Sequence, residues 1–176
     1  MPSHQRTATL IALAMAAGGA LLLTGRPPGA APGVGDRAAV ISVGDGDTLR
    51  VHRGGRATTV RLACIDAPET SQGGWGEQSR LYLMRRLPRG RQVTIVTHTI
   101  DRYGRTVAEV ISDININLVM VEDGQAFVYR RYLAGCATRE YLEAENRARR
   151  RRYGIWQVEG GITRPWDARR RGVAGA

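Results

Sequence analysis

The chain has 176 residues, of which 43% are hydrophobic and 6% aromatic, so it has room for one globular domain with tails and a mainly aliphatic core. Its formal net charge is +10 and its 26 basic residues are all arginine, which favours a polyanionic partner such as nucleic acid. A guanidinium group suits phosphate recognition because it can hold two oxygens at once, although a GC-rich genome explains the absence of lysine more simply.

The first 36 residues are predicted to lie outside the folded domain. Thr9 to Thr24 is a continuous run of apolar and small residues, and a segment rich in Pro and Gly follows it. This order is typical of a signal peptide or a short membrane anchor, and the sequence leaves open which of the two it is. An Ala-rich cytosolic tail is the third alternative. Under either of the first two, the domain is secreted or lies outside the cytoplasm, in the anchored case held by residues 9–24.

From residue 37 onward the pattern predicts strands first and then helices, as a domain over residues 37–157 and a basic tail over 158–176. Runs of β-branched and apolar residues between tight turns predict five strands, and apolar residues at helical spacing predict three helices. Such a series suits a small closed Greek-key barrel of the oligonucleotide-binding (OB) type. The strands are expected at 39–43, 49–52, 58–65, 91–100 and 106–111, and the helices at 77–87, 117–123 and 139–152, the last capped by Thr138.

The two cysteines, Cys64 and Cys136, are an even number in a chain that is expected to leave the reducing cytosol. A disulfide between them is one interpretation, and two small buried hydrophobic residues is the other. Neither cysteine has a Cys or His neighbour at the spacing of metal ligands, which argues against a zinc site.

Short motifs with acidic and arginine side chains recur along the predicted domain. Two carboxylates suit a hard cation, a third suits the handling of a water molecule, and two guanidinium groups suit a phosphate. Together they indicate a centre that cleaves phosphodiesters. The motifs are Asp45-Gly46-Asp47-Thr48, Arg61 to Glu69, Asp101-Arg102-Tyr103-Gly104-Arg105, Tyr129 to Tyr132 and Gly154-Ile155-Trp156.

Several of these segments also have a simpler interpretation. Asp45 belongs mainly to a tight turn with Gly46. Arg61 would by itself be an edge-strand charge, and the acids near it a polar loop. Arg147 to Arg152 is expected to be a solvated helix face. In the C-terminal tail, Trp166 either packs on the domain or stacks on a bound strand, and we favour packing.

In their order and spacing, the motifs resemble those of the staphylococcal nuclease (thermonuclease) family over about residues 38–156. The resemblance implies an α+β fold, with a five-stranded OB barrel and three helices, and a calcium-dependent endonuclease site that acts on DNA and RNA. The chain departs from the family pattern in the short, Gly-rich loop at residues 70–76, which contains Trp75. The rim of the pocket and the substrate preference are therefore expected to differ from those of the family.

The resemblance also assigns roles to residues of this chain. Asp47 and Asp66 would bind Ca²⁺ together with the main-chain carbonyl of Ala67. Glu69 would act on the attacking water, as a general base in our preferred interpretation or as a residue that orients the water. The residues implied in holding the scissile phosphate are Arg61 and Arg105, and those implied in the nucleotide pocket are Arg102, Tyr103 and a tyrosine of residues 129–132, which we assign as Tyr129.

Two other function classes remain open at this point. One is a non-catalytic nucleic-acid-binding OB module of the cell envelope, and the other is an envelope protein that binds a metal or an anion. The presence of both Glu69 and Arg105 argues against them, because binding alone requires neither at these positions. We expect a monomer.

Overall fold

The computed structural model describes residues 35–172 of the chain. The predicted apolar segment at residues 9–24 lies outside this range. Within residues 35–172, the helices are too short or too polar to cross a membrane.

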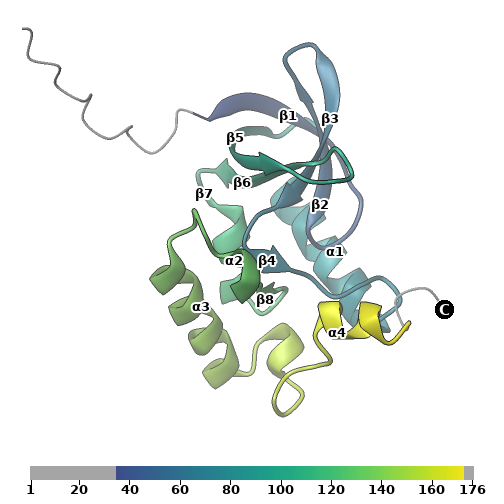
Figure 1. Cartoon of the computed structure of the whole chain (residues 1–176), viewed down its shortest axis with the longest axis vertical. Coiled ribbons are helices and arrows are strands. Elements are labelled where there is room, and N and C mark those ends of the chain that lie inside the picture. The colour runs from purple at the N-terminus through teal and green to yellow at the C-terminus, as the bar shows by residue number, and fades with distance from the viewer. Residues whose placement is uncertain (1–34, 173–176) are drawn as a thin grey trace, which may run out of the picture. The chain divides into compact units, whose positions relative to one another are not determined.

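Five strands close into a barrel, which occupies the upper half of Figure 1. The strands follow one another in the order β3-β2-β1-β5-β6, and a parallel pairing of β3 with β6 closes the sheet on itself. The predicted α+β fold with a five-stranded barrel is thereby confirmed. The barrel strands are β1 (Asp36–Val43), β2 (Thr48–Arg53), β3 (Arg56–Leu62), β5 (Gln92–Ile100) and β6 (Thr106–Ser112).

Aliphatic side chains fill the barrel because they alternate along its strands. In β6 the residues from Thr106 to Ser112 are buried at every second position, as expected for a strand with one face in the core. Leu49, Val60 and Val110 are fully shielded from solvent, and each comes from a different strand. The low aromatic content of the chain is therefore matched by an interior of Val, Leu, Ile and Ala.

Three short strands lie outside the barrel order. β7 (Ile114–Asn115) extends the main sheet beside β6, whereas β4 (Ile65–Asp66) and β8 (Phe127–Val128) form a separate antiparallel pair. The predicted strand at residues 58–65 is thus divided, since β3 ends at Leu62 and β4 begins at Ile65 after a two-residue turn. This turn positions the candidate site.

Four α-helices lie in the described part of the chain, one more than expected. The additional helix is α4, which lies within the segment predicted as a basic tail and is yellow in Figure 1. Pro165 is its first residue, where the missing N–H of proline does no harm. The helices are α1 (Gly74–Arg86), α2 (Ile116–Glu122), α3 (Thr138–Arg151) and α4 (Pro165–Arg170). Single 3₁₀ turns lie before and after α3, at Arg130–Tyr132 and Gly154–Trp156.

Two details of the helix boundaries differ from the sequence-based expectation. α1 begins at Gly74, so Trp75 lies in its first turn rather than in a loop. Thr138 does not cap α3: the N-cap residue is Ala137, and no side chain accepts a hydrogen bond there. Local sequence favours Thr as a cap, but the chain enters this helix directly after Cys136, which is covalently held.

Cys64 and Cys136 form a disulfide, as one of the two interpretations of the sequence predicted. The bond joins the turn between β3 and β4 to the segment before α3 across 72 residues of chain. It therefore holds the turn that precedes Asp66.

Candidate active site

Asp47 and Arg61 lie side by side because β2 and β3 are paired. Thr48, the first residue of β2, lies opposite Arg61 in the antiparallel register, so the acid just before β2 faces the guanidinium group near the end of β3. A glycine is needed at position 46, because a Cβ there would lie 2.2 Å from Oγ of Ser79 in α1. The Asp-Gly-Asp motif is thus a turn that fits closely under α1.

Asp66 reaches the same point through a turn of the chain after β3. Cys64 has a φ of 66°, which is uncommon for a residue with a side chain, and after this turn β4 pairs with β8 instead of continuing the barrel sheet. The main-chain N–H of Tyr129 donates to the carbonyl oxygen of Cys64 over 2.9 Å and fixes the turn. The side chain of Asp66 is 0% exposed as a result.

One guanidinium group joins the two carboxylates. Nη2 of Arg61 donates to Oδ1 of Asp66 over 2.5 Å, and Nη1 forms an ion pair with Oδ1 of Asp47. The N–H of Ala67 donates to the other oxygen of Asp47 over 2.7 Å. Burial lowers the pKa of Arg61 below its ordinary value, although the charges of Asp66 and Asp45 oppose this shift. Arginine nevertheless stays protonated in proteins, so the site contains a buried cation between two acids.

The chemistry of these residues fits a hard divalent cation. Asp47 and Asp66 are buried carboxylates that lie close together, since the two Nη atoms of Arg61 contact one each. The main-chain carbonyl of Ala67 would add a third oxygen ligand. Within residues 35–172, the group of three metal-binding side chains found within 4.8 Å of one another is a different one: Cys64, His98 and Cys136. Its two sulfur atoms are bonded to each other, so it is not a metal site in this state.

Glu69 follows β4 in a turn that is fixed by its neighbours. Its N–H donates to Oε1 of Gln72 over 3.0 Å, and its carbonyl accepts from the N–H of Gln72 over 2.9 Å. The first turn of α1 touches the same backbone, because a Cβ at Gly76 would lie 2.0 Å from the carbonyl oxygen of Glu69. The carboxylate of Glu69 itself forms an ion pair with Arg169 of α4.

Arg105 comes to the site through the closure of the barrel. It precedes Thr106, which lies opposite Val60, the residue before Arg61, in the parallel pairing of β3 with β6. Its charge lies close enough to contribute to the lowered pKa of Arg61. The side chain is half-exposed and held by Asp101, with 2.7 Å between Nε and Oδ2.

Asp101 organises the tip of this hairpin. Its Oδ1 accepts the main-chain N–H groups of Tyr103 and Arg105, each over 2.9 Å. Burial raises the pKa of Asp101, but these bonds and the Arg105 side chain outweigh burial and hold the pKa below its ordinary value. Tyr103 is 68% exposed, and its ring lies under the guanidinium groups of Arg102 and Arg105, which are 4.8 and 5.4 Å from the ring centroid.

Tyr129 lies on another side of the site, in an aromatic stack. Its ring is stacked on Trp166 with 4.9 Å between centroids and 3° between planes, and Tyr132 meets it edge-on at 4.8 Å. Trp166 also contacts Phe127 edge-on, so it packs on the domain, as we favoured from the sequence. One face of Tyr129 is therefore covered by α4, while Tyr132 is exposed.

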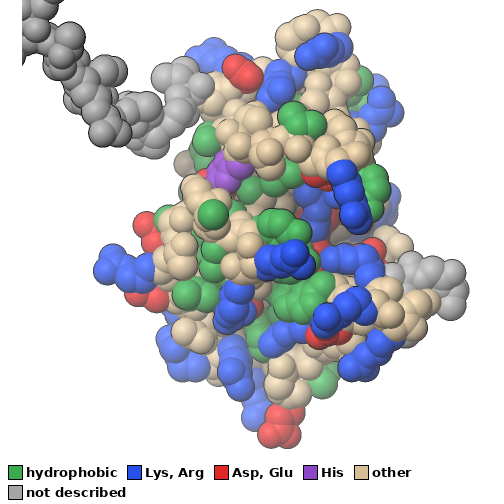
Figure 2. All heavy atoms as spheres, in the orientation of Figure 1, with side chains coloured by type: hydrophobic (Ala, Val, Ile, Leu, Met, Phe, Trp, Pro, Cys, Tyr) green, Lys and Arg blue, Asp and Glu red, His purple; other side chains and the backbone are tan. Residues whose placement is uncertain are grey.

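Basic side chains surround this region. Figure 2 shows arginine side chains over much of one face, with few acidic side chains between them, including the part formed by α3 and α4. Such a surface attracts a polyanion and concentrates it near the site.

The residue that sequence analysis missed is Arg169. Its Nη2 donates to Oδ2 of Asp66 over 2.6 Å, and its Nη1 pairs with Glu69, so it contacts two of the predicted site residues. A Pro at the first helical position, with an acid in the first turn, is a signal for a helix at Pro165–Arg170. No local signal indicates where that helix docks, since Arg169 lies 100 residues from Glu69 in the chain.

Comparison with known proteins agrees with this geometry. The model of the family described as "Staphylococcal nuclease homologue" matches residues 59–158. The chain is 36% identical over 144 residues to a protein of Shigella flexneri named "Micrococcal nuclease", covering 76% of this chain and 80% of that one. It is 36% identical over 137 residues to an "Uncharacterized endonuclease" of Escherichia coli O157:H7, covering 75% and 84% respectively.

The match spans more than half of the chain and includes Arg61, Asp66, Glu69 and Arg105. Asp47 precedes the matched range, and α4 follows it. The barrel, the buried carboxylates and the two arginines near them agree with the sequence similarity, and the chain therefore belongs to the staphylococcal nuclease family of phosphodiester hydrolases.

Proposed function

We propose that this protein is a calcium-dependent endonuclease that hydrolyses phosphodiester bonds of DNA and RNA. The observation that carries the proposal is the meeting of two buried carboxylates, Asp47 and Asp66, at one guanidinium group, Arg61. A buried charge is costly to keep unless it serves a partner, so this arrangement is typical of a functional site rather than of a structural core.

In this proposal Asp47, Asp66 and the Ala67 carbonyl would hold the cation, which would supply Lewis-acid stabilisation of a phosphate oxygen and polarise water. Oxygen donors and few protein ligands suit Ca²⁺, which accepts six to eight oxygens and can keep positions for water and substrate. The family membership supports metal dependence, and the choice of Ca²⁺ is part of the proposal.

The two arginines act on the phosphate. Attack by water at phosphorus places additional negative charge on the equatorial oxygens, and a guanidinium group held in place beforehand stabilises that charge without reorganisation. Arg61 is held by its buried position in β3, and Arg105 by its bond with Asp101. Both are therefore oriented before the substrate binds.

Glu69 is assigned to the attacking water, as a general base. Its backbone is fixed on both sides, by Gln72 and by the first turn of α1, so its carboxylate has a restricted direction. Arg102, Tyr103 and Tyr129 would contact the nucleotide on either side of the phosphate. The exposed ring of Tyr103 under two guanidinium groups is suited to stacking on a base.

We further propose an extracytoplasmic location and action as a monomer. The disulfide between Cys64 and Cys136 supports the location, because such bonds persist in oxidising compartments. The predicted signal or anchor at residues 9–24 is the second argument.

The test uses the full chain with circular single-stranded DNA, circular duplex DNA and RNA, in calcium and in chelator. Cleavage of circles identifies an endonuclease, and cleavage that persists in chelator would contradict metal dependence. Asp66→Asn, Glu69→Gln and Arg105→Ala should each lower kcat, by about 10²- to 10³-fold for the arginine. Asp113→Asn is the matched control, because Asp113 is exposed and, among the described residues, its side chain forms an ion pair only with Arg91, at 3.8 Å. Near-normal rates of the site variants would refute the role assignments.

A further inference from the structure

Arg169 binds two of the acidic residues of the candidate site. Its guanidinium lies between Asp66 and Glu69: Nη2 is 2.6 Å from Oδ2 of Asp66, Nη1 is 3.4 Å from Oδ1, and Nη1 also pairs with Glu69. Because Arg61 holds the other side of Asp66, both oxygens of this buried carboxylate are bound by guanidinium groups. The proposed cation ligand and the proposed general base are thus tied to the same side chain.

The two arginines on Asp66 differ in their freedom to leave. Arg61 lies on a barrel strand, and its side chain is only 14% exposed. Arg169 is 40% exposed and lies in a helix of six residues, which is too short to be stable without its contacts. Partial burial lowers the pKa of Arg169, but its hydrogen bonds with Asp66 and Glu69 outweigh this and raise the pKa. Arg169 therefore stays charged, and its greater exposure and short helix make it the more readily displaced of the two arginines.

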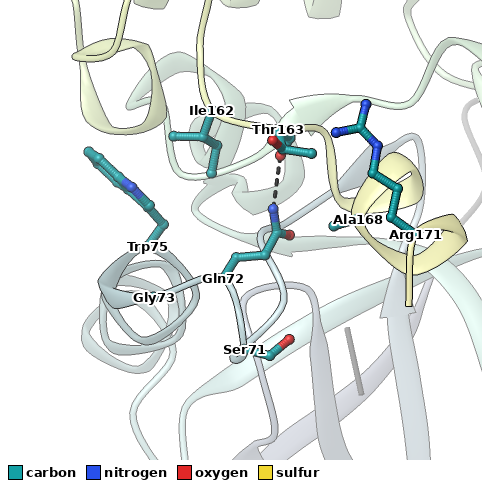
Figure 3. Close-up of a pocket in the computed structure, with 8 residues that line it drawn as sticks. All are labelled: Ser71, Gln72, Gly73, Trp75, Ile162, Thr163, Ala168 and Arg171. Carbon is teal, nitrogen blue, oxygen red and sulfur yellow. Dashed lines mark hydrogen bonds between the residues drawn. The ribbon is translucent and has the colours of Figure 1, made fainter. Parts of the chain in front are cut away.

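The packing under α4 also leaves room for movement. Figure 3 shows a hollow between the loop after Glu69, the start of α1 and α4, with Trp75, Ala168 and Arg171 on its walls. Its volume is about 360 Å³, and one hydrogen bond, from Gln72 Nε2 to the carbonyl of Thr163 over 2.9 Å, crosses between the loop and the segment before α4. α4 thus borders this hollow, while Trp166 packs it against Phe127 and Tyr129.

We propose that Arg169 is an internal competitor of the divalent cation: in the metal-free protein its guanidinium neutralises Asp66 and Glu69, and cation binding displaces it. As a consequence, the proposed general base, Glu69, and the proposed metal ligand, Asp66, are both freed from Arg169 when the cation binds. This inference rests on the proposed function, since it requires that Asp66 serves a cation. It goes beyond the family match, because α4 follows the matched residues 59–158.

The experiment measures calcium binding by titration calorimetry on the full chain without substrate. Arg169→Ala should bind Ca²⁺ about tenfold more tightly than the wild type. This change is expected if Arg169 occupies the acidic residues in about nine wild-type molecules in ten without the cation. Arg169→Lys keeps the charge but cannot bridge two carboxylates, so it should bind with intermediate affinity. Arg170→Ala is the matched control, because Arg170 is next along the helix and pairs with Asp167 outside the site.

A second measurement uses the stability of the same proteins. By linkage, Arg169→Ala should lower the urea midpoint in chelator, and saturating calcium should remove most of this difference. Equal destabilisation with and without calcium would show that Arg169 stays in place, and would overturn the inference.

The binding data separate the alternatives. If Arg169→Ala gains affinity but Arg169→Lys equals the wild type, the effect is simple charge repulsion and the competition is refuted. Equal affinity of all four proteins also refutes it, while leaving the calcium assignment intact. Binding in none of them would overturn the calcium assignment and the competition together, whereas the nuclease assay described above would still test the activity.

Discussion

Removal of the Cys64–Cys136 disulfide should destabilise the fold by about 4 kcal/mol. The bond closes a loop with a sequence separation of 72. In the chain-entropy model, a loop of that length restricts the unfolded state by about 15 cal/mol/K, which corresponds to about 4.4 kcal/mol at 25 °C. The perturbation is the double substitution Cys64→Ala and Cys136→Ala, which leaves no unpaired thiol.

The assay is urea unfolding followed by far-UV circular dichroism. With a slope of about 2 kcal/mol/M for a domain of this size, the midpoint should fall by about 2 M. Wild-type protein treated with reductant is the internal control and should unfold at the midpoint of the double variant. A fall of less than about 0.5 M in both would refute the reasoning, because it would mean that the unfolded chain is not restricted by the loop.

Loss of the bond should also affect the site, because Cys64 lies two residues before Asp66 and has a strained backbone. Without the covalent link, the turn keeps only hydrogen bonds, from the Tyr129 N–H to the Cys64 carbonyl and from Asn117 to the Ala63 carbonyl among them. We therefore expect weaker calcium binding in the double variant under conditions where it is still folded.

Three further predictions concern single residues. Gly76→Ala should lower kcat without unfolding the protein, because its Cβ would press on the Glu69 carbonyl. Gly74→Ala is the control and should leave kcat unchanged, since nothing lies within 4 Å of a Cβ there. Equal kcat values of the two variants would show that the contact with Glu69 does not matter for catalysis. Asn117→Ala should cost about 2 to 4 kcal/mol in urea unfolding, since its side chain bonds three backbone groups at 3.0 Å. Burial and a bond with Asp123 raise the pKa of Tyr82 to about 12. The folded state therefore favours the neutral tyrosine, and the free energy of unfolding should fall from pH 10 to pH 12. A Tyr82→Phe variant whose free energy of unfolding falls as much over this range would disprove the role of Tyr82.

Much of the barrel follows from local rules that act along the sequence. The alternation in residues 106–112 and the tight turns predict strands wherever they occur, because one face of each strand must be buried. The acidic and arginine residues stand at the ends of these strands or just beyond them, and pairing of two adjacent strands through a short hairpin brings Asp47 next to Arg61. The motif order then indicates the family without knowledge of the coordinates.

The errors arise where contacts between distant segments decide the structure. Thr138 has a good capping side chain, yet the chain enters α3 from a cysteine that is bonded 72 residues away. Trp75 was expected in a Gly-rich loop, but α1 begins at Gly74, and Gly76 allows its first turn to pack against the Glu69 backbone. Local propensity is a weak term compared with such packing.

The amino-acid sequence by itself indicated five strands through their periodicity, and the order and spacing of its motifs indicated the barrel fold and the identity of the acids and arginines. Tertiary structure alone decided what those groups touch. Arg169 reaches Asp66 and Glu69 because α4 docks beside β4 and β8, with Trp166 stacked on Tyr129. No period or motif encodes a contact across 100 residues; it depends on how the folded surfaces fit together.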